Sequence, residues 1–156
     1  MGVRLLQGGF RDGEIPLDST DAASNPFYGG APATIGASGA KLAKSATQKA
    51  FIGVFAVSSY EARKTGVVTI LAGAGRFQFL VGSASQDVAN DLGDTVEGAP
   101  YDTTVTFAAG EFLYISATGK WTNTGVVGQE KGIVIKGQTS QDDSVIAYVF
   151  PVSAQA

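Results

Sequence analysis

From residue 51 onward, short apolar runs alternate with clusters of turn-forming residues, and this pattern limits the fold more than any other feature of the chain. The run at 75–81 alternates, so Phe77 and Phe79 share one face while Arg76 and Gln78 share the other. Further runs of strand length are residues 51–57, 66–71, 101–107, 111–117, 120–127, 131–136 and 143–150. No crossover helices separate them, which disfavours a parallel α/β sheet. The pattern predicts an all-β fold, a small antiparallel β-barrel or sandwich.

Residues 1–50 follow a different pattern. They are rich in Gly, Ala and Ser, and Pro16, Pro26 and Pro32 interrupt regular pairing. Their apolar side chains keep neither period 2 nor period 3.6. We expect a long, irregular, extended N-terminal arm at 1–50 that is ordered against a partner, with the β body at 51–156. A segment folded onto its own domain is the equally open alternative. The arm residues expected to make contacts are Leu5, Leu6, Phe10, Ile15, Leu17, Phe27 and Tyr28.

The chain contains neither His nor Cys, which removes the commonest groups of catalysis and metal binding. Ser-His-Asp and Cys-His nucleophiles, ordinary structural zinc sites and iron–sulfur ligation are excluded. We therefore predict that the protein is not an enzyme, with no catalytic, cofactor-binding or metal-binding residues and no cofactor. A net charge of −3 disfavours nucleic acid as a partner. No apolar run is long enough for a membrane-spanning helix, so no membrane partner is expected.

Some local patterns have plain structural interpretations. The Gly-Ala-Gly at 73–75 is only a fragment of a dinucleotide fingerprint, because no third Gly follows at the right spacing, and it predicts a tight hairpin turn. Residues 83–94 are consistent with one short helix. Tyr114 and Ile146 are expected to face the core, like the two phenylalanines of 75–81.

Trp121 is the single tryptophan of the chain. In an alternating strand one face of residues 120–124 must be buried, so a core anchor with a paired indole N–H is the favoured role. An exposed stacking platform for a sugar is the alternative.

One stretch goes beyond a generic β pattern. Residues 107–150 contain a Gly turn, an apolar LYIS strand, a Gly-Lys turn, a Thr-rich strand, a G-I-V segment, a polar turn and a final apolar strand. This order resembles the carboxyl halves of the small decoration (cement) proteins of tailed bacteriophage capsids. The pieces that carry the resemblance are Gly110, residues 113–116, Gly119, Lys120, and residues 121–124, 132–135 and 144–150.

The resemblance implies a structural virion protein that binds the outer surface of a phage capsid and stabilises the shell. Its partners would be the major capsid protein and further copies of itself, with a homo-oligomeric trimer favoured. It would be made in the host cytoplasm and located on the capsid exterior. The alternative is a carbohydrate-binding module or fibre adhesin domain of a phage. A buried Trp121 favours the first hypothesis, and an exposed one the second.

Overall fold

The structure is a computed structural model, and it describes residues 3–79, 99–139 and 144–150. It confirms the predicted all-β class, because the described chain is built mainly of antiparallel strands with a few short helices. The elements are β1 (Val3–Pro16), α1 (Ser19–Ser24), β2 (Pro32–Gly36), β3 (Gly39–Leu42), the 3-10 helix η1 (Gln48–Ala50), β4 (Phe51–Phe55), α2 (Ser59–Thr65), β5 (Val67–Phe79), β6 (Phe112–Ile115), β7 (Trp121–Thr122), β8 (Gly132–Lys136) and β9 (Val145–Val149).

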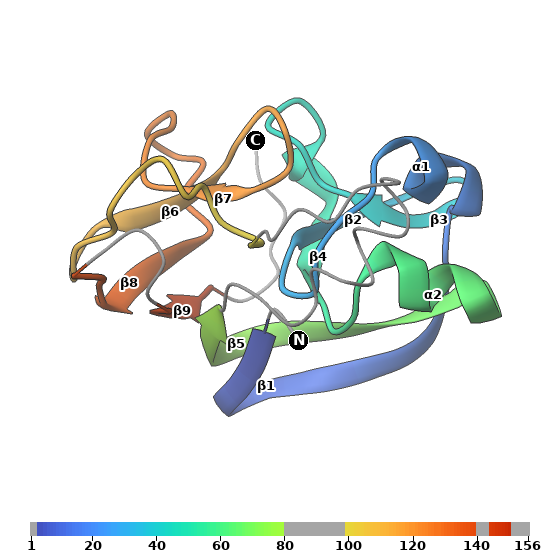
Figure 1. Cartoon of the computed structure of the whole chain (residues 1–156), viewed down its shortest axis with the longest axis horizontal. Helices are drawn as coiled ribbons and strands as arrows, with labels where there is room; N and C mark the ends of the chain where they lie inside the picture. The colour runs from blue at the N-terminus through green and yellow to red at the C-terminus, as the bar shows by residue number, and fades with distance from the viewer. Residues whose placement is uncertain (1–2, 80–98, 140–143, 151–156) are drawn as a thin grey trace.

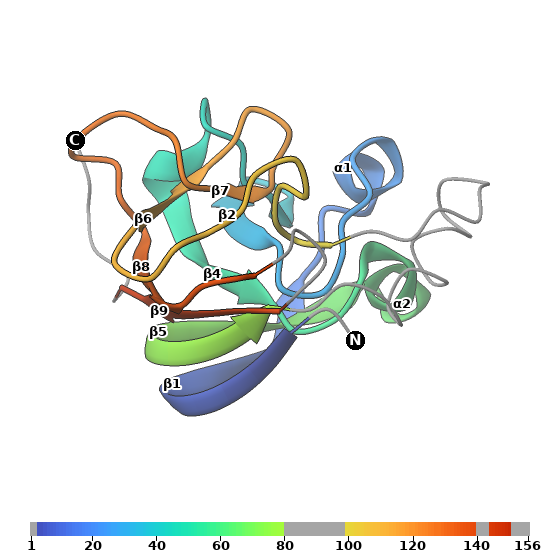
Figure 2. The same cartoon turned by 60° about the vertical axis from the view of Figure 1, so that its left-hand side comes forward.

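The strands follow one path, β3-β2-β4-β5-β9-β8-β6-β7, and β1 pairs with β5 beside it. Figure 1 and Figure 2 show the two longest strands, β5 and β1, side by side along the bottom of the molecule, and β9 pairs with β5. The two halves of the path pack together over the larger hydrophobic cluster, where the Trp121 ring lies edge-on to the Phe51 ring at 5.9 Å between centroids. The described strands do not close into a barrel, so the structure fits the sandwich form of the prediction.

Residues 3–16 form strand β1, where the sequence pattern predicted an irregular arm. Its 14 residues pair with β5 along the whole strand, but the register shifts at three points. Gly8 and Glu14 take positive φ angles of 71° and 60° beside these shifts. Each extra residue in a bulge disturbs the side-chain alternation, which explains why the apolar residues show no period of 2. The prediction of an irregular arm is therefore wrong for residues 3–16, which are folded onto their own domain.

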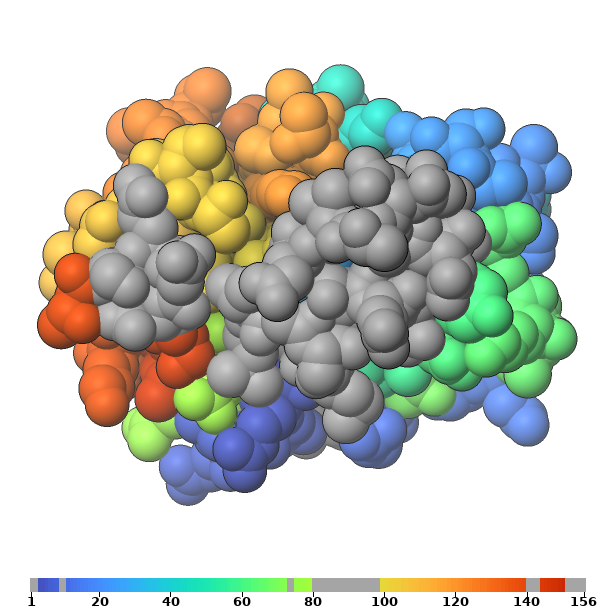
Figure 3. Space-filling model, in the orientation of Figure 1, coloured from blue at the N-terminus to red at the C-terminus, as the bar shows by residue number. Residues whose placement is uncertain are grey.

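The same supersecondary unit occurs twice, in residues 17–72 (the first unit) and in the described part of residues 101–150 (the second unit). The two units occupy opposite sides of the molecule in Figure 3, the first from blue to green and the second from yellow to red. Corresponding strands pair in the same register. The pair Pro32–Val54 of the first unit corresponds to Phe112–Ile133 of the second. In the same way, Ala33–Gly53 corresponds to Leu113–Gly132, and Val54–Leu71 corresponds to Ile133–Tyr148.

Hydrogen bonds between the loops repeat as well. The matched bonds are Gly30 N to Phe55 O (2.7 Å) with Gly110 N to Val134 O (2.8 Å), Ser59 N to Phe27 O (3.0 Å) with Gln138 N to Phe107 O (2.8 Å), and Phe27 N to Ser59 Oγ (3.0 Å) with Phe107 N to Gln138 Oε1 (3.0 Å). Because these bonds lie outside the strand ladders, the two units share their loop paths and not only their sheet registers.

The two units pack with different faces toward each other. The inner face of the first unit, represented by Phe55, packs with α1 and α2 in the smaller hydrophobic cluster. Its counterpart in the second unit, Val134, belongs to the larger cluster. That cluster also holds Val54, which points to the opposite side of β4 from Phe55. The outer face of the first unit therefore covers the inner face of the second.

Several local predictions need correction. Residues 73–75 lie inside β5 and form no hairpin turn. Within residues 101–107 only Tyr101 forms a bridge, to Trp121, so this run is not a strand. Tyr114 and Ile146 are only half-buried, because the residues beside them in β6 and β9 face the core instead. The predicted helix at 83–94 lies outside the described residues.

Candidate functional site

The predicted contact residues that follow β1 are part of the core of the first unit. Leu17, Phe27 and Tyr28 leave only 6%, 2% and 9% of their surfaces exposed. The Phe27 ring stacks on the Phe55 ring with 3.8 Å between centroids. Little surface on these side chains is left for a partner.

The predicted contact residues within β1 have mixed surroundings. Leu5 and Ile15 are half-buried, against the larger and the smaller hydrophobic cluster respectively. Leu6 is 42% exposed, beside a register shift of the strand. The Phe10 side chain lies outside the described part of the structure. The structure therefore does not bring the predicted contacts together on one accessible surface, and Leu6 alone is shown to be open to a partner.

Trp121 joins the two units. It is fully buried, and its indole Nε1 donates a hydrogen bond of 2.8 Å to the Gly30 carbonyl oxygen of the first unit. Its ring contacts Phe51 and Phe79, with 5.9 and 5.8 Å between centroids. The prediction of a core anchor with a paired N–H is confirmed, and Trp121 is not available as a sugar platform in this structure.

The most exposed large apolar side chains described lie in the loop between β7 and β8. Val126 is 64% exposed and Val127 is 89% exposed. The loop is held at both ends, since Gly125 packs against the Tyr114 ring and the Gly128 N–H donates to the Glu130 carboxylate at 2.9 Å. A fixed loop that presents two valines to solvent is a candidate contact site. The strand predicted at residues 120–127 therefore ends before these valines, and the glycines that flank them are the sequence signal for a loop.

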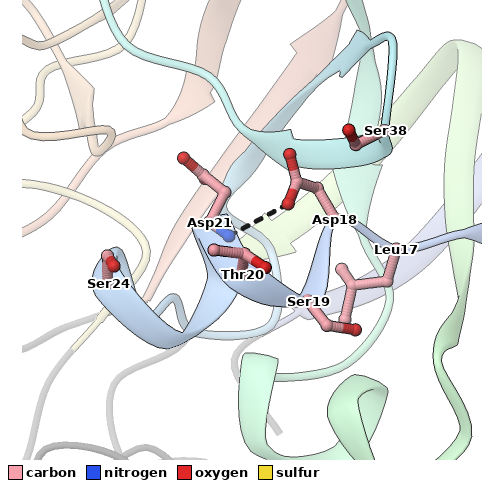
Figure 4. A pocket seen from close by; sticks show the side chains of 7 residues that line it. All are labelled: Leu17, Asp18, Ser19, Thr20, Asp21, Ser24 and Ser38. Atoms are coloured by element: carbon pink, nitrogen blue, oxygen red, sulfur yellow. Dashed lines mark hydrogen bonds between the residues drawn. The ribbon is translucent and has the colours of Figure 1, made fainter.

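A polar depression surrounds the start of α1 (Figure 4). It is lined by Leu17, Asp18, Ser19, Thr20, Asp21, Ser24 and Ser38. The Asp18 carboxylate accepts a 3.0 Å hydrogen bond from the Asp21 N–H and so caps the helix. The equivalent Asp102 of the second unit accepts from the Thr104 N–H at 2.8 Å. These carboxylates have a structural role in both units.

A second hollow lies between the units, with Gln48 on one side and Gln129 on the other. The Gln48 Nε2 group donates to the Ser45 carbonyl oxygen and to Gln129 Oε1, both at 2.9 Å. Its Oε1 atom is buried and has no hydrogen-bond partner within the described structure. Because that oxygen is itself inaccessible, a bound molecule cannot reach it without a rearrangement of the hollow.

Two lysines of the second unit lie over aromatic rings of the first. Lys120 Nζ is 5.7 Å from the Tyr28 ring centroid, and Lys131 Nζ is 5.9 Å from that of Phe51. Burial lowers the pKa of both ammonium groups, and the charges of Asp102 near Lys120 and of Glu130 near Lys131 oppose part of the shift. Partly desolvated cations over rings strengthen the contact between the units.

In residues 3–79, 99–139 and 144–150 no three acidic side chains lie close enough together to hold a metal ion. No helix in these ranges is long and apolar enough to cross a membrane. No protein-family model matches the chain, and no curated protein matches it at a significant level.

Proposed function

We propose that this protein is a structural component of a tailed-bacteriophage virion, which binds the outside of the capsid and stabilises the shell. The proposal includes the major capsid protein and further copies of the chain as its partners. The capsid contact is made by apolar surface, because Val126 and Val127 are the most exposed large apolar side chains of the described chain.

The observation that carries the proposal is that the stretch resembling decoration proteins falls within one structural unit. The described part of residues 107–150 lies in the second unit, which has its own strand pairs and loop bonds and shares its buried core with the first unit. The Gly turns and apolar strands of the resemblance fall on turns and strands of the structure, including Gly110 and Gly119 with positive φ angles of 90° and 84°. A resemblance whose pieces coincide with strands and turns of one unit is stronger support than one that crosses element boundaries.

The buried position of Trp121 also supports this proposal over its alternative. A carbohydrate-binding module needs an aromatic ring that a sugar can reach, and Trp121 has no exposed surface. The adhesin hypothesis therefore loses its tryptophan platform.

The test is co-sedimentation of the purified chain with shells assembled from the coat protein that is encoded near its gene. We expect saturable binding that survives a rise from about 0.1 M to 1 M salt, where the Debye length falls from about 10 to 3 Å. A chain that stays in the supernatant contradicts the proposal, and release by salt alone contradicts the apolar contact.

A pair of variants locates the contact on the shell. Val127→Asp changes the most exposed apolar side chain described and is expected to lower occupancy without changing the melting temperature. Ala37→Asp is the matched control, since it places the same charge in the exposed β2–β3 turn of the first unit. Equal occupancy of both variants would move the coat contact away from the β7–β8 loop.

A further inference from the structure

Within the described residues, the second unit has an apolar outer face that is partly exposed. Phe112 pairs with Ile133, and Ile133 pairs with Tyr148, in a row across β6, β8 and β9. Directly opposed residues share one face of a sheet, and the neighbours of these residues along each strand face the core. Phe112 is 45% exposed, and Ile135 beside this row is 41% exposed. We call Phe112, Ile133, Ile135, Tyr148 and Phe150 the outer face of the second unit.

The first unit shows what happens to the same face when it has a partner. Val54 and Leu71 stand where the second unit has Ile133 and Tyr148, and only 0% and 3% of their surfaces are exposed. They are covered by the second unit, whose Trp121 belongs to the same cluster. One copy of this face is thus buried against a β unit of the same chain, whereas in the other copy Phe112 and Ile135 are exposed and Ile133, Tyr148 and Phe150 are half-buried.

The charges at the rim of the outer face favour a second copy as its partner. On the β6 side, the Tyr114 hydroxyl donates to Glu130 at 3.4 Å, and Tyr114 shares the face of Phe112 because the two alternate along the strand. On the opposite side, Arg76 of β5 is exposed and is the Cα partner of Tyr148. A two-fold axis along the strand direction, lying in the interface, therefore brings the Glu130 side of one copy over the Arg76 side of the other.

We propose that the outer face of the second unit binds the same face of a second copy of this chain. The proposal rests on the self-association included in the proposed function, but not on capsid binding. A self-complementary face closes as a two-fold pair, whereas the sequence analysis favoured a trimer. The apolar centre supplies the affinity, and the opposed carboxylate and guanidinium rims set the orientation.

The experiment is sedimentation velocity with native mass spectrometry on the purified full chain, from about 1 to 100 μM. We expect a concentration-dependent dimer. Ile135→Glu buries two charges in the pair, one from each copy, so it is expected to weaken dimerisation by at least about 100-fold. Ile35→Glu is the matched control, because Ile35 has nearly the same exposed fraction, 42%, in the first unit and lies outside the face. That variant is expected to dimerise like the wild type.

A second variant protects the test against loss of folding. Arg76→Glu changes an exposed side chain, so the melting temperature is expected to stay constant while dimerisation weakens by about 10-fold. A chain that is monomeric throughout, a trimer, or a dimer that Ile135→Glu and Arg76→Glu leave intact would overturn the proposal. Because no shells are present, this failure is separate from that of the proposed function, which predicts binding to shells whatever the state of the free chain.

Discussion

The first unit has helices of its own that cover the inner face of its strands, and the second unit has none among the described residues. Helices α1 and α2 close the inner face of the first unit, at positions where the second unit has shorter connections between its strands. The second unit instead closes its inner face against the outer face of the first. Two copies of one supersecondary unit thus reach a buried core by different means, which teaches that the core of the second unit depends on the first.

The difference is sharpest at one position of the β2–β3 and β6–β7 hairpins. Ala40 pairs with Ile35 in the first unit, and Trp121 pairs with Ile115 in the second, and both Ala40 and Trp121 are fully buried. The Asp102 N–H donates to the Trp121 carbonyl oxygen at 2.8 Å, as the equivalent aspartate does to Ala40 in the first unit. The same backbone position therefore holds alanine in the first unit, whose inner face is covered by α1 and α2. It holds tryptophan in the second unit, whose inner face packs against the first unit.

The largest expected effect comes from removing that tryptophan. Trp121→Ala leaves a cavity between the units and breaks the indole hydrogen bond to the first unit, so the free energy of unfolding should fall by about 3–5 kcal/mol. Urea unfolding followed by circular dichroism measures it. Trp121→Phe is the control, which keeps a ring in the joint and is expected to lose clearly less. A loss below about 1 kcal/mol for the alanine variant would contradict the dependence of the second core on the first.

The next prediction compares the two glycines at which neighbouring strands lie very close together, Gly53 in the first unit and Gly132 in the second. A Cβ on Gly53 would lie 2.5 Å from the Leu71 carbonyl oxygen, and one on Gly132 would lie 2.5 Å from that of Tyr148. Gly53→Ala and Gly132→Ala should each lower the free energy of unfolding by about 1–3 kcal/mol. Gly53→Ala should lose more, because Gly53 also has a φ of 137°.

A third glycine provides the control for this pair. A Cβ on Gly13 of β1 would meet its nearest atom, Thr69 Oγ1, at 3.7 Å, which is ordinary contact. Gly13→Ala should therefore stay within about 0.5 kcal/mol of the wild type. If Gly132→Ala behaves like this control, the strands of the second unit are further apart than those of the first.

Sequence reasoning succeeded where a strand alternates without interruption. The 75–81 run placed Phe77 and Phe79 in the core and Arg76 outside, as observed, and Trp121 was correctly assigned to the core. These successes share a cause, since side-chain burial then follows directly from period 2.

The failures have physical causes as well. Strand β1 was not predicted because the bulges at Gly8 and Glu14 each shift the alternation of apolar and polar residues that identifies a strand. The internal repeat was visible in the spacing of glycines at turns and close approaches, but it was missed because most other residues differ between the units. These glycines are Gly30 and Gly53 in the first unit and Gly110 and Gly132 in the second.

A smaller effect compares the side chains that anchor the matched loops. Ser59 Oγ accepts from the buried Phe27 N–H, and Gln138 Oε1 accepts from the partly buried Phe107 N–H. Ser59→Ala should lower the free energy of unfolding by about 1–3 kcal/mol, because the buried N–H is left without this acceptor. Gln138→Ala should lose about 0.5–1 kcal/mol, since water can take its place.

Hydrogen exchange separates this effect from a general loss of stability. The Phe27 amide should exchange faster in Ser59→Ala, and the Phe107 amide in Gln138→Ala, beyond the change in global stability. Ser38→Ala changes an exposed serine in the β2–β3 turn and should alter neither amide. Equal losses in both units would show that the two loops are buried to the same depth, contrary to the structure.

The smallest effect concerns Lys131, which stands where the first unit has Ile52. Burial lowers the pKa of its ammonium group, and the neighbouring Glu130 opposes part of the shift. A base whose pKa is lower in the folded state binds fewer protons there than in the unfolded chain. This group therefore makes stability rise with pH, from its lowered folded-state pKa up to the ordinary lysine value of 10.5.

Lys131→Ile introduces the residue of the first unit and removes that titration. As the pH rises toward the ordinary lysine value, the wild type should gain stability relative to the variant, since the tyrosines titrate in both proteins and cancel in the difference. Lys136→Ile, at an exposed lysine of β8, is the control and should keep the wild-type pH dependence. If the difference in the free energy of unfolding between wild type and Lys131→Ile does not change with pH, the Lys131 ammonium is as well solvated in the folded protein as in the unfolded chain. In that case Lys131 does not belong to the buried contact between the units.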